Sequence, residues 1–199
     1  MTICYVLGDE LYLNLTNRCT NRCEFCVRDT DGGIADGLDL WLDREPTVSE
    51  IKEDIRRFDP SRYREVVFCG YGEPTMRFDD LIEVAKFIKE QYGSKIRINT
   101  NGHANRIMGR DVTSELSGLV DTISISLNAK NREEYEKLCH CDYAEEGFDE
   151  MLDFAEKCKA YVPNVVMSVV DVISKEDIEA CRKIAEDLGI TFRAREMIQ

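Results

Sequence analysis

Short apolar segments alternate with longer amphipathic segments along the chain, and this alternation constrains the fold more than any other feature. Six segments have the length and composition of strands: residues 11–15, 65–69, 96–100, 122–127, 164–170 and 191–195. Strands separated by helices in this way form a parallel sheet with helical crossovers. We therefore expect an α/β fold with six parallel strands and outer helices, arranged as a partial (β/α)6 barrel. A doubly wound open sheet with the same elements is the alternative.

Helix signals fill the gaps between these strands. Thr47 and Glu50 form a capping-box pattern at the start of the first helix. Further helices are expected at residues 78–92, 104–118, 131–139, 148–161 and 174–188. An extra strand at residues 3–7 is expected to pair with the first strand across the Gly8-Asp9 turn. With no linker or repeat in the sequence, we expect one domain over residues 1–199, with residues 27–46 as a lid over the active site.

The charge balance excludes several classes of partner. The 199 residues include 39 acidic and 26 basic ones, which gives a formal net charge of −13. Such a surface repels phosphate backbones and anionic membranes, so neither nucleic acid nor membrane is an expected partner. Residues 1–5 have no basic region followed by an apolar run, and no segment reaches the length of a membrane span. We therefore expect a cytoplasmic protein.

Three of the nine cysteines form the pattern C-x3-C-x2-C directly after the first strand, at Cys19, Cys23 and Cys26. In β/α folds, active sites collect at the carboxyl ends of the strands. Three thiolates can bind three irons of a [4Fe–4S] cluster and leave the fourth iron open. A zinc site is the alternative, although three cysteines without a nearby fourth ligand suit zinc poorly. We expect Cys4, Cys69, Cys158 and Cys181 to be ordinary buried thiols. Cys139 and Cys141 could join a second site, but two thiols are too few for a cluster, so ordinary thiols are favoured there as well, and His140 is expected to be inert.

The cysteine motif, with Phe25 before its last cysteine, resembles the signature of the radical S-adenosylmethionine (SAM) superfamily. Three further segments are similar to motifs of that family: Gly70-Tyr71-Gly72-Glu73-Pro74, Asn99-Thr100-Asn101-Gly102 and Ser124-Ile125-Ser126-Leu127-Asn128-Ala129. Tyr71 replaces the usual second glycine of the first of these. The resemblance implies a [4Fe–4S] cluster and SAM as cofactors, and reductive cleavage of SAM to a 5′-deoxyadenosyl radical that abstracts hydrogen from substrate. It assigns the SAM-binding role to Phe25, Gly70, Tyr71, Gly72, Glu73, Asn101, Ser126, Asn128 and Asp171.

The substrate side is less defined by sequence. Candidate contacts are Arg28, His103, Arg193 and Arg195. Arg193 and Arg195 are two residues apart on a strand and therefore share one face. If that face points into the barrel, the two cations need an anion; if it points outward, they belong to a solvated edge. Trp41, within the expected lid, is a candidate for stacking or packing.

More narrowly, residues 14–28 resemble the short TatD-associated radical SAM proteins, a group that includes the queuine lyases. That likeness implies a lyase that releases queuine from queuosine 5′-phosphate, a small-molecule substrate, and a flavodoxin or ferredoxin as electron donor. The alternatives are an activating enzyme that forms a radical on a partner protein, a radical SAM enzyme for another nucleoside or a peptide, an iron–sulfur carrier and an RNA-modifying enzyme. A homodimer is one way to cover the open side of the barrel.

Overall fold

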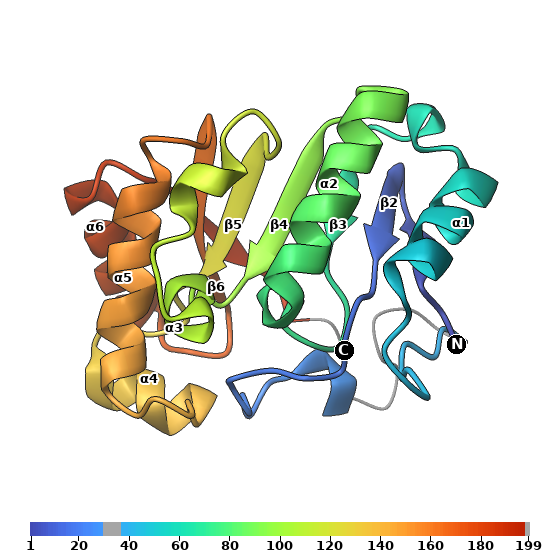
Figure 1. Ribbon diagram of the computed structural model, residues 1–199. Coiled ribbons are helices and arrows are strands. Elements are labelled where there is room, and N and C mark those ends of the chain that lie inside the picture. The colour runs from blue at the N-terminus through green and yellow to red at the C-terminus, as the bar shows by residue number, and fades with distance from the viewer. Residues whose placement is uncertain (30–36, 198–199) are drawn as a thin grey trace.

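The computed structural model describes residues 1–29 and 37–197, and its core is one curved sheet whose strands follow the order of the chain (Figure 1). The strands are β1 (Cys4–Leu7), β2 (Glu10–Leu13), β3 (Val66–Phe68), β4 (Ile96–Thr100), β5 (Thr122–Ser126), β6 (Asn164–Val170) and β7 (Thr191–Arg195). β1 is antiparallel to β2, and every later pair is parallel. The expected six parallel strands and the extra strand across the Gly8-Asp9 turn are confirmed. A doubly wound sheet is excluded because its strand order reverses in the middle.

The helices cover one face of this sheet (Figure 1). They are α1 (Val48–Phe58), α2 (Phe78–Tyr92), α3 (Ala104–Met108), α4 (Arg132–Cys139), α5 (Glu146–Cys158) and α6 (Lys175–Asp187). The capping box of α1 is present: the Thr47 side chain accepts from the Glu50 backbone N–H, and the Glu50 side chain accepts from the Thr47 backbone N–H. Short 3₁₀ turns lie at Val27–Asp29, Pro60–Arg62, Pro74–Arg77 and Thr113–Leu116.

The single helix expected at residues 104–118 is wrong. α3 ends at Met108 because Gly109 adopts a left-handed φ of 65°, a conformation in which glycine typically ends a helix. The 3₁₀ turn Thr113–Leu116 then replaces the rest of the predicted helix.

Alternation along the strands separates an apolar outer face from a polar inner face. In β4, Ile96 and Ile98 are fully buried, whereas Arg97 and Asn99 point to the opposite side. Ile98 pairs with Ile123 in β5, and Asn99 pairs with Ser124. The outer face is the hydrophobic core under the helices, and the inner face is left for ligands.

An ion-pair cluster fills the inner face near the amino ends of the strands. Arg97 pairs with Glu10 at 2.6 Å and with Glu65 at 3.2 Å, and its side chain is only 13% exposed. Arg64 also pairs with Glu10, and the Tyr12 hydroxyl donates to Glu10 at 2.6 Å. This end of the barrel interior is therefore occupied by the protein's own charges.

Within the described residues, none of the helices combines the length and the apolar character needed to cross a membrane.

Candidate active site

The three-cysteine loop follows β2, and backbone hydrogen bonds attach it to the carboxyl end of α4. The Arg22 N–H donates to the Cys139 carbonyl at 2.8 Å, and the Glu24 N–H donates to the Leu138 carbonyl at 3.0 Å. The last carbonyls of a helix have no partner within the helix, so the loop satisfies them. In Figure 1 the loop lies below the carboxyl ends of the strands, beside α4.

A buried chain of hydrogen bonds supports the loop from beneath. The Asn101 amide donates to Thr20 Oγ1 at 2.7 Å, and Thr20 Oγ1 lies 2.9 Å from His103 Nδ1. His103 Nε2 lies 2.9 Å from the Gly147 carbonyl, which can only accept, so Nε2 carries the proton. Nδ1 then accepts from the Thr20 hydroxyl. Every member of the chain thus has a fixed hydrogen-bonding role.

The structure does not place His103 at a substrate site. Its side chain is fully buried, and desolvation by burial lowers its pKa from 6.5 to about 4. A neutral imidazole with both nitrogens engaged serves to hold the loop. A substrate contact was expected because His103 follows the turn after a strand. Its structural role could not be predicted from the sequence, since the partners Thr20 and Gly147 are 83 and 44 residues away in the chain.

The turn after β3 packs against the segment that leads into the cysteine loop. A Cβ on Gly70 would lie 2.1 Å from Asn14 Oδ1, and one on Gly72 would lie 2.2 Å from the Thr16 carbonyl oxygen. Only glycine permits this approach at both positions. Tyr71, between them, is buried and meets Trp41 edge-on at 5.3 Å. The tyrosine therefore keeps the turn intact and adds an aromatic wall.

The Glu73 carboxylate acts as a buried hydrogen-bond acceptor for its surroundings. It accepts from the Thr75 backbone and hydroxyl at 3.0 and 2.6 Å, from the Thr100 hydroxyl at 2.7 Å and from the Asn101 backbone at 2.7 Å. Burial raises its pKa. The carboxylate thus joins the turn after β3 to the end of β4, next to the residue that supports the cysteine loop.

These elements surround one cavity of about 700 Å³ at the carboxyl ends of the strands. Most of the residues singled out in the sequence line it: Cys19, Cys23, Phe25, Cys26, Gly70, Tyr71, Gly72, Glu73, Asn101, Ser126, Asn128, Arg193 and Arg195. A smaller hollow of about 410 Å³ at the opposite end of the strands, near Lys95 and Asn164, contains none of them.

Three predicted site residues do not line this cavity: Arg28, His103 and Asp171. Asp171 is exposed, and its carboxylate accepts from the Met197 backbone N–H at 2.8 Å. It lies one residue past the end of β6, where it connects to the segment after β7. Arg28 lies 3.7 Å from Asp29. Part of the expected lid, residues 30–36, lies outside the described residues. Leu40 and Leu42 of the remainder are buried.

Sequence reasoning missed the inner-face residues on the other side of the cavity. Tyr5, Tyr12, Cys69, Asn99 and Ser124 all line it. Cys69, expected to be an ordinary buried thiol, is the residue that directly precedes the turn after β3. The signal was available, since residues at alternate positions of adjacent strands share one face. Cys4, Cys158 and Cys181 are buried as expected.

The donor set at one end of the cavity suits an iron–sulfur cluster. Burial raises the pKa of Cys19 to about 12 and also raises that of Cys26, while the neighbouring Cys139 thiol and burial raise that of Cys23. In the part of the chain that the structure describes, no three His, Cys, Asp or Glu side chains are grouped to hold a single ion. A four-iron cluster binds each cysteine through a different iron, so separated thiols suit it.

Polar atoms left without partners also indicate a ligand. Asn128 is 4% exposed, yet its Oδ1 has no donor among the described residues. Asn99 Oδ1 and Arg195 Nε are likewise buried without a described partner. Buried polar atoms are normally hydrogen-bonded, so the cavity is built for an occupant that carries both donors and acceptors.

Comparison with known proteins gives a consistent result. The sequence model of the radical SAM superfamily matches residues 13–188. A probable GTP 3′,8-cyclase of Thermococcus kodakarensis is 30% identical over 160 residues, which cover 80% of this chain and 47% of that protein. A putative glycyl-radical enzyme activating enzyme of Methanocaldococcus jannaschii is 26% identical over 178 residues, covering 86% of this chain and 67% of the relative. The chain spans about half to two thirds of the length of these relatives.

Solved structures share the fold. SuiB of Streptococcus suis, in a crystal structure with bound S-adenosylmethionine, superposes with a TM-score of 0.67 at 16% identity over 97% of this chain and 40% of its own. The FeFe-hydrogenase maturase HydG of Carboxydothermus hydrogenoformans also gives 0.67 at 16% identity, over 96% of this chain and 44% of its own.

Proposed function

Because the chain belongs to the radical SAM superfamily, we propose that it abstracts a hydrogen atom from a small-molecule substrate held in the 700 Å³ cavity. The protein is a radical SAM enzyme, and its cofactors are a [4Fe–4S] cluster and SAM. When bound, the reduced cluster and SAM supply a 5′-deoxyadenosyl radical. The substrate and the outcome of the reaction are the proposal.

The chain's own residues divide the work as follows. Cys19, Cys23 and Cys26 bind the cluster. Gly70 and Gly72 let the turn after β3 pack against the segment that leads into the cysteine loop, and Glu73 holds that turn against β4. The residues proposed to contact SAM, by the family motifs and by their position in the cavity lining, are Phe25, Gly70, Tyr71, Gly72, Glu73, Asn101, Ser126 and Asn128.

One observation carries this proposal: the cysteines, the glycine turn and the polar strand ends line a single cavity. They come from segments more than 100 residues apart in the chain. An electron-carrier protein would saturate its cluster with four cysteines and would have no need of a large neighbouring cavity. The arrangement favours an enzyme over a carrier.

Queuosine 5′-phosphate is the most specific substrate we propose, with release of queuine as the lyase reaction. Three observations support a free nucleotide. The N-terminal block resembles the queuine lyases, a cavity of 700 Å³ is within the usual size for a small-molecule site, and the relative named GTP 3′,8-cyclase acts, by that name, on a nucleotide. A net charge of −13 disfavours a whole RNA but does not hinder a small ligand in an internal site.

A second candidate is an activating enzyme that forms a radical on a partner protein. Its support is the likeness to the putative glycyl-radical enzyme activating enzyme. The match covers 67% of that protein, compared with 47% of the probable GTP 3′,8-cyclase. In either case we propose a cytoplasmic protein that receives its electron from a flavodoxin or ferredoxin. We also propose that the protein forms a homodimer, which would cover the open side of the barrel.

The experiment uses protein reconstituted anaerobically with iron and sulfide, then reduced with dithionite in the presence of SAM and queuosine 5′-phosphate. Mass spectrometry follows 5′-deoxyadenosine and queuine together. We expect both products, and we expect Cys23→Ala to abolish both, whereas Cys181→Ala, which removes a buried thiol in α6, retains them.

The outcomes separate the levels of the proposal. Deoxyadenosine without queuine leaves SAM cleavage intact and rejects the queuine-lyase assignment. An intact cluster with neither product rejects stand-alone action on this small molecule and favours the activating-enzyme candidate.

A further inference from the structure

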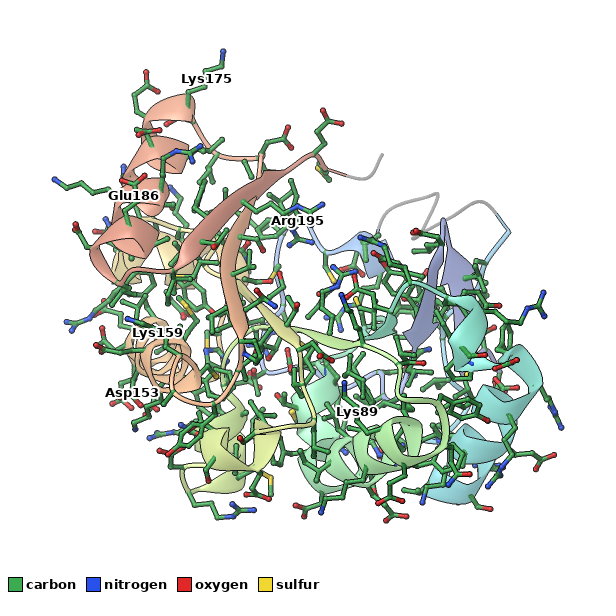
Figure 2. The ribbon with its side chains drawn as sticks, turned by 90° about the horizontal axis from the view of Figure 1, so that it is seen from above. Lys89, Asp153, Lys159, Lys175, Glu186 and Arg195 are labelled. Carbon is green, nitrogen blue, oxygen red and sulfur yellow. The ribbon has the colours of Figure 1, made fainter. Side chains whose placement is uncertain are left out.

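Arg195 is a cation on the inner face of the sheet for which the described protein provides no counter-charge. It is the last residue of β7 and pairs in register with Val170 of β6, which also lines the cavity. Figure 2 shows its side chain on the side of β7 opposite α6, whereas the labelled Lys175 and Glu186 lie on α6 itself. Arg195 therefore points into the cavity.

No carboxylate of the described residues lies within ion-pairing distance of Arg195, although the chain has 39 acidic residues. Its Nε is buried without an acceptor, as is the Nε of Arg97, so the missing carboxylates are what sets Arg195 apart. Desolvation by burial lowers its pKa; Arg193 and Arg97 act in the same direction, and Cys69 acts in the opposite one. A partly desolvated guanidinium without an acceptor is costly, so an unmatched arginine inside a cavity indicates that a ligand supplies the anion.

Another arginine on this face, Arg97, shows that the protein can supply its own counter-charges to an interior cation. Arg97 holds Glu10 at 2.6 Å and Glu65 at 3.2 Å. Arg193, two residues before Arg195, lines the same cavity and pairs in register with Ser168. Two neighbouring cations of the cavity lining thus add to each other's positive potential.

The residues around Arg195 indicate which other chemical groups the ligand carries. Asn99 Oδ1 is a buried acceptor without a described donor, so it requires a hydroxyl or amino group. Across the cavity, the rings of Tyr5 and Tyr12 stack at 5.1 Å and both line the wall. The matching ligand has an anionic group, at least one hydrogen-bond donor and a part that packs against aromatic rings.

We propose that Arg195, assisted by Arg193, is the anion-binding subsite for the substrate, and that it takes a phosphate monoester or a carboxylate of a small hydroxylated molecule. The subsite rests on the proposed function only in that its ligand is the substrate of that reaction. The planar guanidinium donates two parallel hydrogen bonds to either oxyanion. The neutral Cys69 thiol and Asn99 line the space between this subsite and the turn after β3.

The test measures binding to the anaerobically reconstituted holoenzyme with SAM present, by calorimetry. The probes are ribose 5-phosphate, gluconate as a hydroxylated carboxylate, and ribose as the uncharged match. We expect one or both anions to bind and ribose to bind at least about tenfold more weakly. Binding of ribose 5-phosphate alone identifies a phosphate monoester, and binding of gluconate alone identifies a carboxylate.

Variants locate the anion. Arg195→Gln is expected to weaken binding of the preferred anion about tenfold or more, and Arg193→Gln by a smaller factor. Arg182→Gln is the matched control: it removes the same charge from α6, where the guanidinium lies 4.7 Å from the Phe192 ring, and Phe192 is on the outer face of β7. Affinity unchanged in Arg195→Gln, equal loss in Arg182→Gln, or no anion bound by the unaltered enzyme at millimolar concentration would each overturn the proposal.

A folding defect in Arg195→Gln is detected by thermal unfolding of the same sample. Arg195→Lys then serves as the second variant, since it keeps the charge and loses the fork. We expect a several-fold loss of anion affinity with selectivity over ribose retained, and affinity equal to that of the unaltered enzyme would count against the proposal. Deoxyadenosine formation on the same samples separates the two levels. In the unaltered enzyme, SAM cleavage without anion binding sinks the subsite alone, whereas anion binding without SAM cleavage sinks the proposed function alone.

Discussion

The two ends of the barrel interior treat the same residue type in opposite ways. Near the amino ends of the strands, Arg97 is paired with two carboxylates and is 13% exposed. At the carboxyl ends, Arg195 forms no ion pair with a carboxylate of the described residues. The Nε of both arginines lacks a hydrogen-bond acceptor, so the difference lies in the ion pairs. Both side chains belong to one face of one sheet, so the difference is not one of secondary structure. Carboxylates neutralise the guanidinium at the amino end of the strands, whereas the guanidinium that lines the cavity has no carboxylate partner.

This division also separates the charge-filled end of the barrel from the end with the larger cavity. The ion-pair cluster of Glu10, Glu65, Arg64 and Arg97 occupies the amino end, and the 700 Å³ cavity lies at the other. Ligands of β/α proteins enter at the carboxyl ends of the strands. For the inward-facing arginines the comparison makes a testable claim: removing Arg97 should affect stability, and removing Arg195 should affect binding.

The largest stability effect is expected from Glu10→Gln. Glu10 is 8% exposed and interacts with Arg97, Arg64 and Tyr12. Removing one partner of a buried pair leaves the other charge uncompensated, so we expect the free energy of unfolding to fall by about 3 kcal/mol. Urea unfolding measures it. The control Glu53→Gln breaks an exposed pair with Arg57 and is expected to cost less than about 0.5 kcal/mol; equal costs would remove the distinction between the ends.

A similar effect is expected from acid, through His103. Its folded-state pKa of about 4 lies below the unfolded value of 6.5, so the unfolded chain binds the proton first as the pH falls. The stability that the neutral imidazole contributes is present above pH 6.5 and is lost as the pH falls towards 4, by roughly 3 kcal/mol. Urea unfolding at pH 7, 5.5 and 4 should give a flatter dependence for His103→Gln, and an unchanged slope would contradict the buried neutral state.

A smaller loss is expected for Glu73→Gln. The amide would present an N–H group to the donors that the carboxylate now satisfies, and one mismatched buried hydrogen bond costs about 2 kcal/mol. Because Glu73 accepts from the Asn101 backbone, the same change should slow SAM cleavage by the reconstituted enzyme. Glu133→Gln, at an exposed position of α4, should alter neither property.

The smallest effect is the most direct test of the comparison. Arg195→Gln should leave the free energy of unfolding of the ligand-free protein unchanged or raise it by up to about 1 kcal/mol, because it removes an unmatched and partly desolvated charge. Arg97→Gln should lower the same quantity, since it removes the buried ion-pair partner that Glu10 and Glu65 share. If both variants lose the same stability, Arg195 has a structural partner and the contrast between the two ends fails.

Much of the fold was predictable because it depends on local periodicity. The bounds of β4, β6, β7 and α2 agree with the sequence prediction, and so does the capping box of α1. The helix at residues 104–118 failed because one left-handed glycine, Gly109, outweighs an otherwise suitable stretch. The positions of the cavity-lining motifs followed from the rule that ligands gather at strand carboxyl ends.

The roles of individual side chains were less predictable. His103 and Asp171 both stand near strand ends, yet each is engaged by the protein itself and lies outside the cavity lining. Their partners come from distant segments, so no local pattern distinguishes them from ligand-binding residues. Arg195 could be narrowed to two alternatives from its spacing with Arg193, and only the pairing of β6 with β7 decides that the pair faces inward.

The attachment of the cysteine loop has a consequence for how its sequence can change over generations. Arg22 and Glu24 contact the end of α4 through their backbone N–H groups, and their side chains extend to exposed partners, Asp142 and His140. Every amino acid except proline has the backbone N–H group that makes this contact. The residues at these two positions can therefore be substituted while the loop keeps its conformation. Thr20 lacks this freedom, because its hydroxyl is the contact. The backbone conformation of the loop can therefore be conserved while the side chains at positions 22 and 24 change.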